Sequence, residues 1–306
     1  RGLGDVYKRQ IVCCASMILS LCMFTVHASA AETQAPEPDV YQLSFKAGEA
    51  YNGSTKADVV RDNNTEDPAA PEIITSSKIN RDVAKLNGQS AYVLKGFKDN
   101  YPDINALTLE AYFMVESFAA EYVDIISYQN AGGLGIEIEN PDADAGTAAL
   151  TFYLNFNEDR ADIVNAAEIE FGTYYHVVVT FGAGKACVYV NGELAESAEY
   201  DSSYTFKYPT QGEPTDFVIG GDVNELNLGE RIFTGELAVA NIYNKALNAE
   251  EISAVYQRAL NGDAADPDDP TPENPGADPN PGTGDFGLLY TAVPFLSALV
   301  ALKRKK

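Results

Sequence analysis

The chain has 306 residues, with 45 acidic and 21 basic side chains and a net charge of −24 at pH 7. This charge excludes nucleic acids and anionic lipid surfaces as ligands, because proteins bind both through patches of Lys and Arg. Three of the four cysteines and one of the two histidines fall in the first 30 residues, so the rest of the chain can form neither a zinc site from His and Cys nor an internal disulfide.

Residues 1–30 have the layout of a secretory signal peptide. A basic pair precedes an apolar run over residues 11–26, and Ala28 and Ala30 supply the small side chains of an A-x-A cleavage site. An uncleaved membrane anchor is the alternative interpretation. We expect residues 1–10 to be artefactual, because they resemble translated adapter sequence.

Residues 38–262 have the pattern of one β-rich domain. Apolar and polar side chains alternate over residues 151–157 and 174–181, which is typical of strands with one buried face. Asn-Gly at residues 191–192 favours a type I′ hairpin turn. Strands do not alternate with helices, so we predict an all-β domain of antiparallel sheets. Further strands are expected near residues 91–95, 107–115, 123–128, 134–139, 217–220 and 236–243.

One short helix is expected at the end of this domain. Asn248 can cap it, and Ile252, Val255 and Ala259 lie on one apolar stripe before Gly262 ends it. Residues 263–283 are rich in Asp, Pro, Asn and Gly and have few apolar side chains, which predicts an extended, disordered linker that spans the cell wall.

The C-terminal residues 280–306 combine a polar motif, an apolar run over residues 286–302 and a basic tail. The run has about the 17 residues that a helix needs to cross a bilayer, and Lys and Arg favour the cytoplasmic side. This order resembles the C-terminal sorting signal of Gram-positive surface proteins, and a plain stop-transfer helix is the alternative. The resemblance implies that a sortase cleaves after Thr283 and joins it to peptidoglycan. The motif consists of Asn280, Pro281, Gly282, Thr283 and Gly284.

Motifs in the β-rich domain resemble a second family. They lie, in order, at residues 107–112, 174–180, 187–194, 218–222 and 233–247. Together they are similar to the laminin-G-like, concanavalin A-like jelly roll of bacterial surface proteins, over residues 41–258. The resemblance implies a two-sheet sandwich that binds glycans or protein surfaces, or that hydrolyses polysaccharides. The chain departs from the family in having no Trp, because Tyr112 and Tyr175 stand where Trp is usual.

The polar positions of the predicted strands are the candidate ligand-binding residues. If these strands adjoin in one sheet, their polar sides form a concave surface that bears rings, amides and carboxylates, which is the mixture that sugars need. The alternative is that the tyrosines stand there only as strand formers. A loop rim with Gln129 and Asn130 is a second candidate. The face residues are Glu110, Tyr112, Glu137, Tyr153, Asn155 and His176.

Catalytic and metal sites are weaker candidates. Laminarinase-like relatives need three carboxylates at alternate positions of one strand, but Pro141 takes the third place after Glu137 and Glu139. By resemblance to this fold class, a calcium ion could bind the loop of Asp222, Asn224 and Glu225, since calcium takes oxygen ligands.

We therefore predict a secreted, cell-wall-anchored, non-catalytic module that binds a glycan or glycoprotein. A protein-binding adhesin without sugar binding is the first alternative, and a weak polysaccharide hydrolase is the second.

Overall fold

The computed structural model describes residues 33–61, 70–118, 121–129, 131–210, 216–222 and 231–262. The predicted signal peptide, linker and sorting signal lie outside these residues, as do Asn130, Asn224 and Glu225. Within the described part of the chain, none of the helices has the length and apolarity that crossing a bilayer requires.

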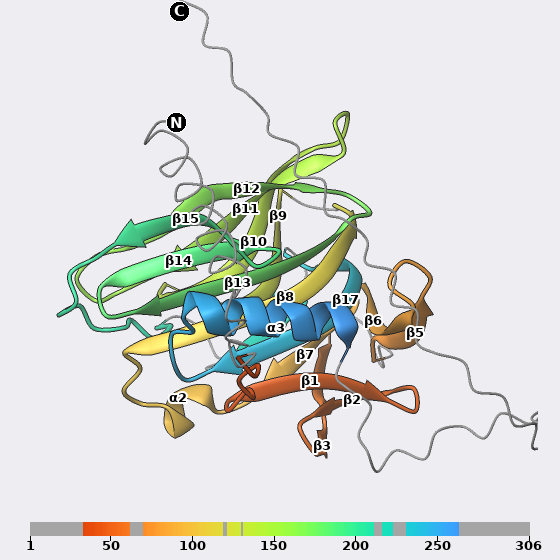
Figure 1. Cartoon of the computed structure of the whole chain (residues 1–306), viewed down its shortest axis with the longest axis horizontal. Coiled ribbons are helices and arrows are strands. Elements are labelled where there is room, and N and C mark those ends of the chain that lie inside the picture. The colour runs from red at the N-terminus through yellow and green to blue at the C-terminus, as the bar shows by residue number, and fades with distance from the viewer. Residues whose placement is uncertain are drawn as a thin grey trace, which may run out of the picture. The chain divides into compact units, whose positions relative to one another are not determined.

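The larger of two antiparallel sheets has ten strands (Figure 1). Its main order is β15-β14-β13-β8-β17-β1-β2-β3, and β6 pairs with both β17 and β5. The strands are β1 (Tyr41–Lys46), β2 (Glu49–Asn52), β3 (Thr55–Lys56), β5 (Glu72–Ser76), β6 (Arg81–Asn87), β8 (Ala106–Ser117), β13 (Tyr174–Gly182), β14 (Lys185–Val190), β15 (Glu193–Glu199) and β17 (Thr234–Tyr243).

The second sheet has seven strands in the order β12-β11-β10-β9-β16-β7-β4. Alternate side chains of both sheets meet in one apolar core, as the period-two pattern predicts. The strands are β4 (Asp58–Arg61), β7 (Ser90–Leu94), β9 (Tyr122–Gln129), β10 (Gly133–Asp142), β11 (Thr147–Leu154), β12 (Ile163–Glu170) and β16 (Phe217–Ile219).

The predicted hairpin at Asn191-Gly192 is confirmed. Both residues have positive φ, 52° and 80°, as a type I′ turn requires, and they join β14 to β15. The prediction of an all-β sandwich of two antiparallel sheets with one short C-terminal helix is likewise confirmed.

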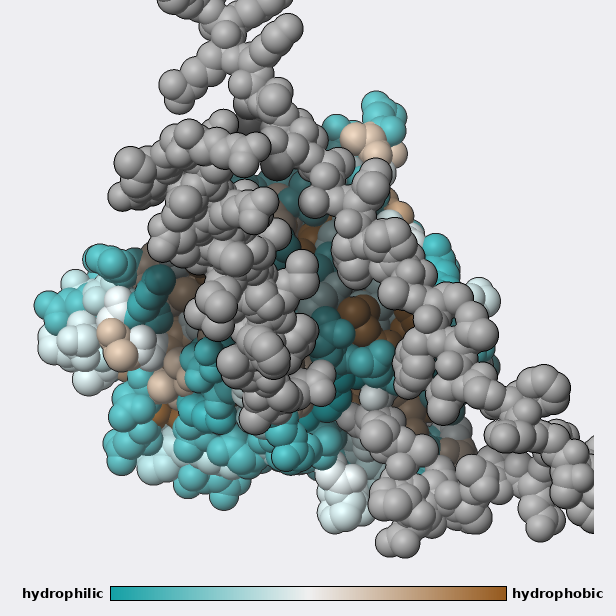
Figure 2. All heavy atoms as spheres, in the orientation of Figure 1, coloured by the Kyte–Doolittle hydropathy of each residue, from teal (hydrophilic) through white to brown (hydrophobic). Residues whose placement is uncertain are grey.

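Helix α3 (Ala249–Asn261) covers the outer face of the ten-stranded sheet (Figure 1). Its N-terminus has a full capping box, because the Asn248 side chain accepts hydrogen bonds from backbone N–H groups and the Glu251 side chain accepts one from the Asn248 backbone N–H. Ile252 and Val255 pack against Val178 of β13 and Tyr243 of β17. A four-residue helix, α2 (Phe97–Asn100), follows β7. In the same orientation, the coloured surface at the lower part of Figure 2 is mostly hydrophilic, and hydrophobic side chains show deeper in the molecule.

Candidate functional site

The structure divides the predicted binding residues between the two sheets. Glu110, Tyr112 and His176 lie on the ten-stranded sheet, whereas Gln129, Glu137, Tyr153 and Asn155 lie on or beside the outer face of the seven-stranded sheet. The prediction that they share one surface is therefore wrong. Alternation identified the polar face of each strand but could not tell which strands adjoin.

The three residues on the ten-stranded sheet are also not accessible. Glu110 and His176 are 0% exposed and Tyr112 is 7% exposed. Tyr112 shares a small apolar cluster with Ala259 of α3, and the ring of Tyr256, also in α3, lies 5.3 Å from that of His176. We therefore correct their assignment from ligand binding to the attachment of the helix.

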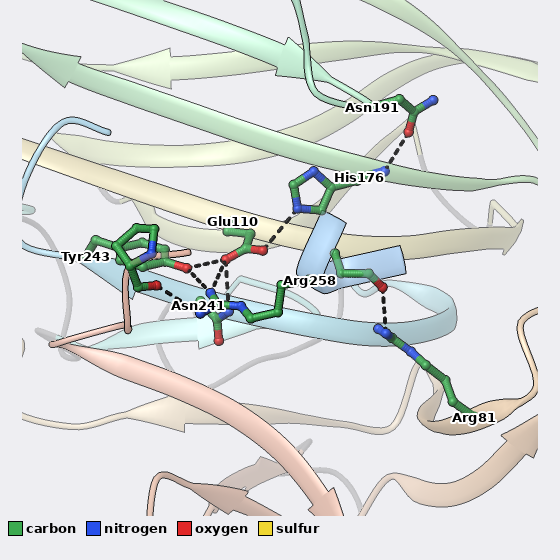
Figure 3. A network of polar contacts seen from close by, with 9 residues as sticks. Arg81, Glu110, His176, Asn191, Asn241, Tyr243 and Arg258 are labelled. Carbon is green, nitrogen blue, oxygen red and sulfur yellow. Dashed lines mark hydrogen bonds and ion pairs between the residues drawn. The ribbon is translucent and has the colours of Figure 1, made fainter. Parts of the chain in front are cut away.

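Glu110 is the centre of a buried polar network under α3 (Figure 3). Its Oε1 lies 3.0 Å from His176 Nε2, and its Oε2 accepts hydrogen bonds from Asn241 Nδ2 at 2.9 Å and from the Tyr243 hydroxyl. Arg258 Nη2, from the helix, lies 3.6 Å from the same Oε2.

These donors determine the charge of Glu110. Burial opposes its ionisation, but the hydrogen bonds and charge of His176, with the bonds from Tyr243 and Asn241, outweigh burial and hold the pKa of Glu110 below its ordinary value. A carboxylate with this many partners is a structural anion that attaches helix to sheet.

Two of the other predicted residues line a groove of about 530 Å³ at the seven-stranded sheet. Gln129 at the end of β9 and Asn155 just after β11 line it, together with Asp222 and Arg231. Asn155 is fixed by its own amide, since Nδ2 donates to the Gly133 carbonyl at 3.0 Å. Gln129 Nε2, in contrast, is buried and has no hydrogen-bond partner among the described residues.

Glycine allows the Gln129 amide to lie flat on the sheet. A Cβ placed on Gly135 would be 2.4 Å from Gln129 Nε2. At the beginning of β10, Gly133 has a φ of +82°, and a Cβ there would meet the Tyr128 carbonyl oxygen at 1.6 Å. The groove therefore depends on glycines at these two positions.

Tyr153 lies on the same face of the sheet, one strand away from Glu137. The Arg160 guanidinium carbon is 5.4 Å from the centre of its ring, which is within cation–π range. Burial, followed by the charges of Glu137 and Glu139, raises the pKa of Tyr153 to about 12. The hydroxyl is therefore a neutral hydrogen-bond donor near neutral pH.

A carboxylate pair bridged by arginine lies beside the groove. Asp124 of β9 and Glu137 of β10 are register partners on adjacent strands, and both are 0% exposed. Arg231 forms an ion pair with Glu137, and its Nη1 is 3.8 Å from Asp124 Oδ1. The same guanidinium lies 5.0 Å from the centre of the Tyr122 ring.

Two ionised carboxylates at this pair would carry more negative charge than the single arginine offsets. Neither carboxylate oxygen of Asp124 accepts a hydrogen bond from a donor among the described residues, and its side-chain hydrogen bond is with the Glu137 carboxyl. Burial, with the charges of Asp222 and Glu137, raises the pKa of Asp124 well above its usual value. Burial also raises the pKa of Glu137, despite the ion pair with Arg231.

Sequence reasoning missed both Arg231 and Asp124 as members of this site. Asp124 stands out only as a single carboxylate inside the apolar run of β9. Arg231 lies 94 residues from Glu137 and outside every predicted strand, so no local pattern connects them.

The candidate catalytic carboxylates are occupied by other contacts. Glu137 pairs with Arg231, and Glu139, which is 5% exposed, accepts a hydrogen bond from Thr151 Oγ1 at 2.5 Å. A glycosidase needs one acid able to protonate the leaving group and a second free to attack or to activate water. These two side chains do not provide that arrangement.

Of the predicted calcium ligands, only Asp222 is described. Its Oδ1 lies 3.4 Å from Ser127 Oγ, and it faces the cluster in which Arg231 already supplies a positive charge. Within the described ranges, no group of three or more His, Cys, Asp or Glu side chains is placed to hold a metal ion. Calcium binding stays a prediction that depends on Asn224 and Glu225.

Comparison with solved structures identifies similar folds at low sequence identity. The binding domain of Paraclostridial Mosquitocidal Protein 1 is 13% identical, with a TM-score of 0.52 over 72% of this chain and 52% of that one. The binding domain of botulinum neurotoxin serotype D is 17% identical, with a TM-score of 0.50 over 72% and 50%. The chain thus spans about half the length of these domains, and the likeness concerns the fold.

Comparison with curated protein sequences gave no significant match. A family profile described as the concanavalin A-like lectin/glucanases superfamily matches residues 87–253, which is more than half of the chain. The matched region runs from the end of β6 into α3 and so includes five of the ten strands of the larger sheet and six of the seven strands of the second. The chain therefore belongs to the concanavalin A-like lectin/glucanases superfamily.

Proposed function

We propose that this protein is a non-catalytic glycan-binding module and that the groove at the seven-stranded sheet is its ligand site. The observation that carries the proposal is the Gln129 amide, which lines the groove with Nε2 buried and without a hydrogen-bond partner in the described residues. A buried donor without a partner is costly, so a turn of the Gln129 side chain that brings Nε2 to a ligand hydroxyl in the groove would relieve this cost.

The chemistry around this amide suits a sugar. Asn155, Asp222 and Arg231 add amide, carboxylate and guanidinium groups to the lining, and Tyr153 places a ring on the adjacent part of the same face. Sugars combine hydroxyls with an apolar C–H face, so a few fixed polar groups beside an aromatic ring match them. Binding domains of two toxins have the same fold, which supports a binding role rather than a catalytic one.

The test is a glycan array probed with the purified protein and two matched variants. Gln129→Ala removes the unpaired amide, and we expect at least a tenfold loss of affinity for any glycan bound by the unaltered protein. Gln257→Ala makes the same change on the exposed side of α3, on the other sheet, and should bind as the unaltered protein does.

The alternatives give different results. If the array gives no hits and the protein still binds protein partners whose glycans have been removed enzymatically, the adhesin without sugar binding is favoured. Release of reducing sugar that disappears in Glu137→Gln would favour the hydrolase.

We also propose secretion and attachment to the cell wall. The support is the order of segments in the sequence, since residues 1–30 and 280–306 lie outside the described structure. In a Gram-positive host, Thr283→Ala should shift the protein from the wall fraction to the membrane or medium. Equal recovery of both forms from purified peptidoglycan would contradict anchoring through Thr283.

Calcium binding by the loop that begins at Asp222 is the remaining proposal. Its support is the sequence pattern of oxygen ligands after Gly220 and Gly221. If the loop binds the ion, calcium should raise the melting temperature relative to EDTA, and Glu225→Gln should reduce that shift.

A further inference from the structure

The two arginines at the groove are already paired with carboxylates of the protein itself. The charge of Arg231 is shared between Glu137, with which it forms an ion pair, and Asp124 at 3.8 Å. Both carboxylates are completely buried, whereas the Arg231 side chain is 36% exposed. A ligand that approaches Arg231 therefore meets a guanidinium whose charge is already offset by the Glu137 carboxylate, with the second acid, Asp124, buried directly behind it.

Arg160, the second arginine of the lining, also forms an ion pair with a carboxylate of the protein. Its Nη2 lies 2.6 Å from Asp162 Oδ2, and its guanidinium lies over the Tyr153 ring. The carboxylate of Asp162 is 16% exposed and also accepts a hydrogen bond from the Leu154 N–H. Arg160 thus contributes hydrogen-bond donors to the groove but little net positive charge.

The remaining charged residues among the described lining do not give the groove a net positive charge. Lys207 is the one lining cation for which the described residues provide no ion pair, and Glu158 and Asp159 line the same groove. Asp222 adds a further carboxylate, and its charge contributes to the raised pKa of the buried Asp124. The local excess of acid has the same sign as the whole chain, whose net charge is −24.

We propose that the groove selects uncharged glycans and sugars that carry a free amine, and that it rejects acidic sugars. This inference deepens the proposed function and rests on it. The carboxylate or sulfate of an acidic sugar would meet like charges from the groove, whereas sugar hydroxyls can use the donors of Gln129, Arg160 and Arg231. The ammonium group of an aminated sugar would be attracted by the same negative charges.

The experiment uses the purified protein on an array of matched oligosaccharides. Each neutral glycan stands beside its sialylated and sulfated forms, and N-acetylglucosamine oligomers stand beside their de-N-acetylated forms. We expect neutral and aminated members to bind at least tenfold more tightly than acidic ones. Preferred binding of acidic members would overturn this inference and leave the proposed function intact. An array without any hits would overturn the proposed function itself.

Salt dependence provides a second measurement on the unaltered protein. Added NaCl screens charge, with a Debye length of about 10 Å at 0.1 M and about 3 Å at 1 M. Affinity for neutral glycans should change less than twofold across this range, whereas weak binding of acidic glycans should strengthen as salt increases. If acidic binding instead weakens with salt, the groove attracts anions and the inference is wrong.

A charge-neutralising variant tests the role of the ion pair. Glu137→Gln removes the carboxylate that forms the ion pair with Arg231 and keeps the size of the side chain. The ratio of acidic to neutral binding should then rise at least tenfold. An unchanged ratio in the folded variant would contradict the proposed neutralisation of Arg231.

Discussion

Replacing Glu110 by Gln should destabilise the protein strongly. The Gln side chain keeps the shape of Glu, but its NH₂ group would face at least one of the groups that donate a hydrogen bond to the carboxylate. The substitution also removes the negative charge near Arg258. Breaking a buried ionic network by removing one partner costs about 3–5 kcal/mol. For a domain of this size each kcal/mol changes the melting temperature by about 2–4 °C, so we expect a decrease of roughly 6–20 °C.

The pH dependence of this effect has a definite sign. The pKa of Glu110 in the folded protein lies below its ordinary value. Its contribution to stability is therefore complete above the ordinary pKa of Glu and is lost as the pH falls through the lowered folded value. The difference in the free energy of unfolding between the unaltered protein and Glu110→Gln should thus be largest near pH 7 and should shrink in acid.

The assay is thermal unfolding by circular dichroism from pH 3 to 8, with Glu116→Gln as the matched control. Glu116 lies on the same strand and pairs with Lys85 at 2.6 Å, but the two side chains are 48% and 28% exposed. A pair of this kind contributes about 0–1 kcal/mol. Equal losses in the two variants, or a Glu110→Gln protein that melts like the unaltered one, would refute the structural role of the buried network.

Two further changes test the seven-stranded sheet. Because burial and neighbouring carboxylates raise the pKa of Asp124, the folded protein retains a proton that the unfolded chain has lost. Stability should therefore fall by up to about 1.4 kcal/mol per pH unit between the ordinary Asp pKa and the raised folded value. Asp124→Asn should remove this decrease of stability with pH, measured by chemical denaturation at pH 4–8 with EDTA present. Parallel plots of stability against pH for the variant and the unaltered protein would contradict the assignment to Asp124. Gly133→Ala should cost at least about 2 kcal/mol more than Gly146→Ala, since both glycines have positive φ but only at Gly133 would the added Cβ meet backbone. Similar melting temperatures for the two alanine variants would show that the start of β10 can relax.

Local patterns in the sequence were sufficient for the elements and the core. Alternation over residues 174–181 indicated which side chains of β13 enter the core, because a strand presents successive side chains to opposite faces. Asn248 and the stripe of Ile252, Val255 and Ala259 likewise predicted a capped helix with one buried face. These signals extend over a few residues, and the backbone geometry of each element determines them.

The site required information that no local pattern contains. Glu110 and Glu137 are equivalent by alternation, since both are carboxylates on the side of their strands away from the core. The apolar stripe of α3 needs a surface to cover, but the sequence does not say which of the two outer faces it covers. Tertiary packing places it over Glu110 and leaves Glu137 beside the groove with Arg231.

The buried carboxylates Glu110 and Asp124 show why residue type alone was a poor guide to the binding face. The surface under α3 contains tyrosines, an imidazole, an amide and an acid, which is the mixture expected for a sugar site. There the helix and adjacent strands satisfy the acid, and the pKa of Glu110 falls. At the seven-stranded sheet Asp124 accepts no hydrogen bond from a donor in the described residues, and its pKa rises. Unsatisfied polar atoms also occur under α3, at His176 Nδ1 and Asn241 Oδ1, but Gln129 lines a groove that the helix does not cover, so the groove is the better candidate for ligand binding.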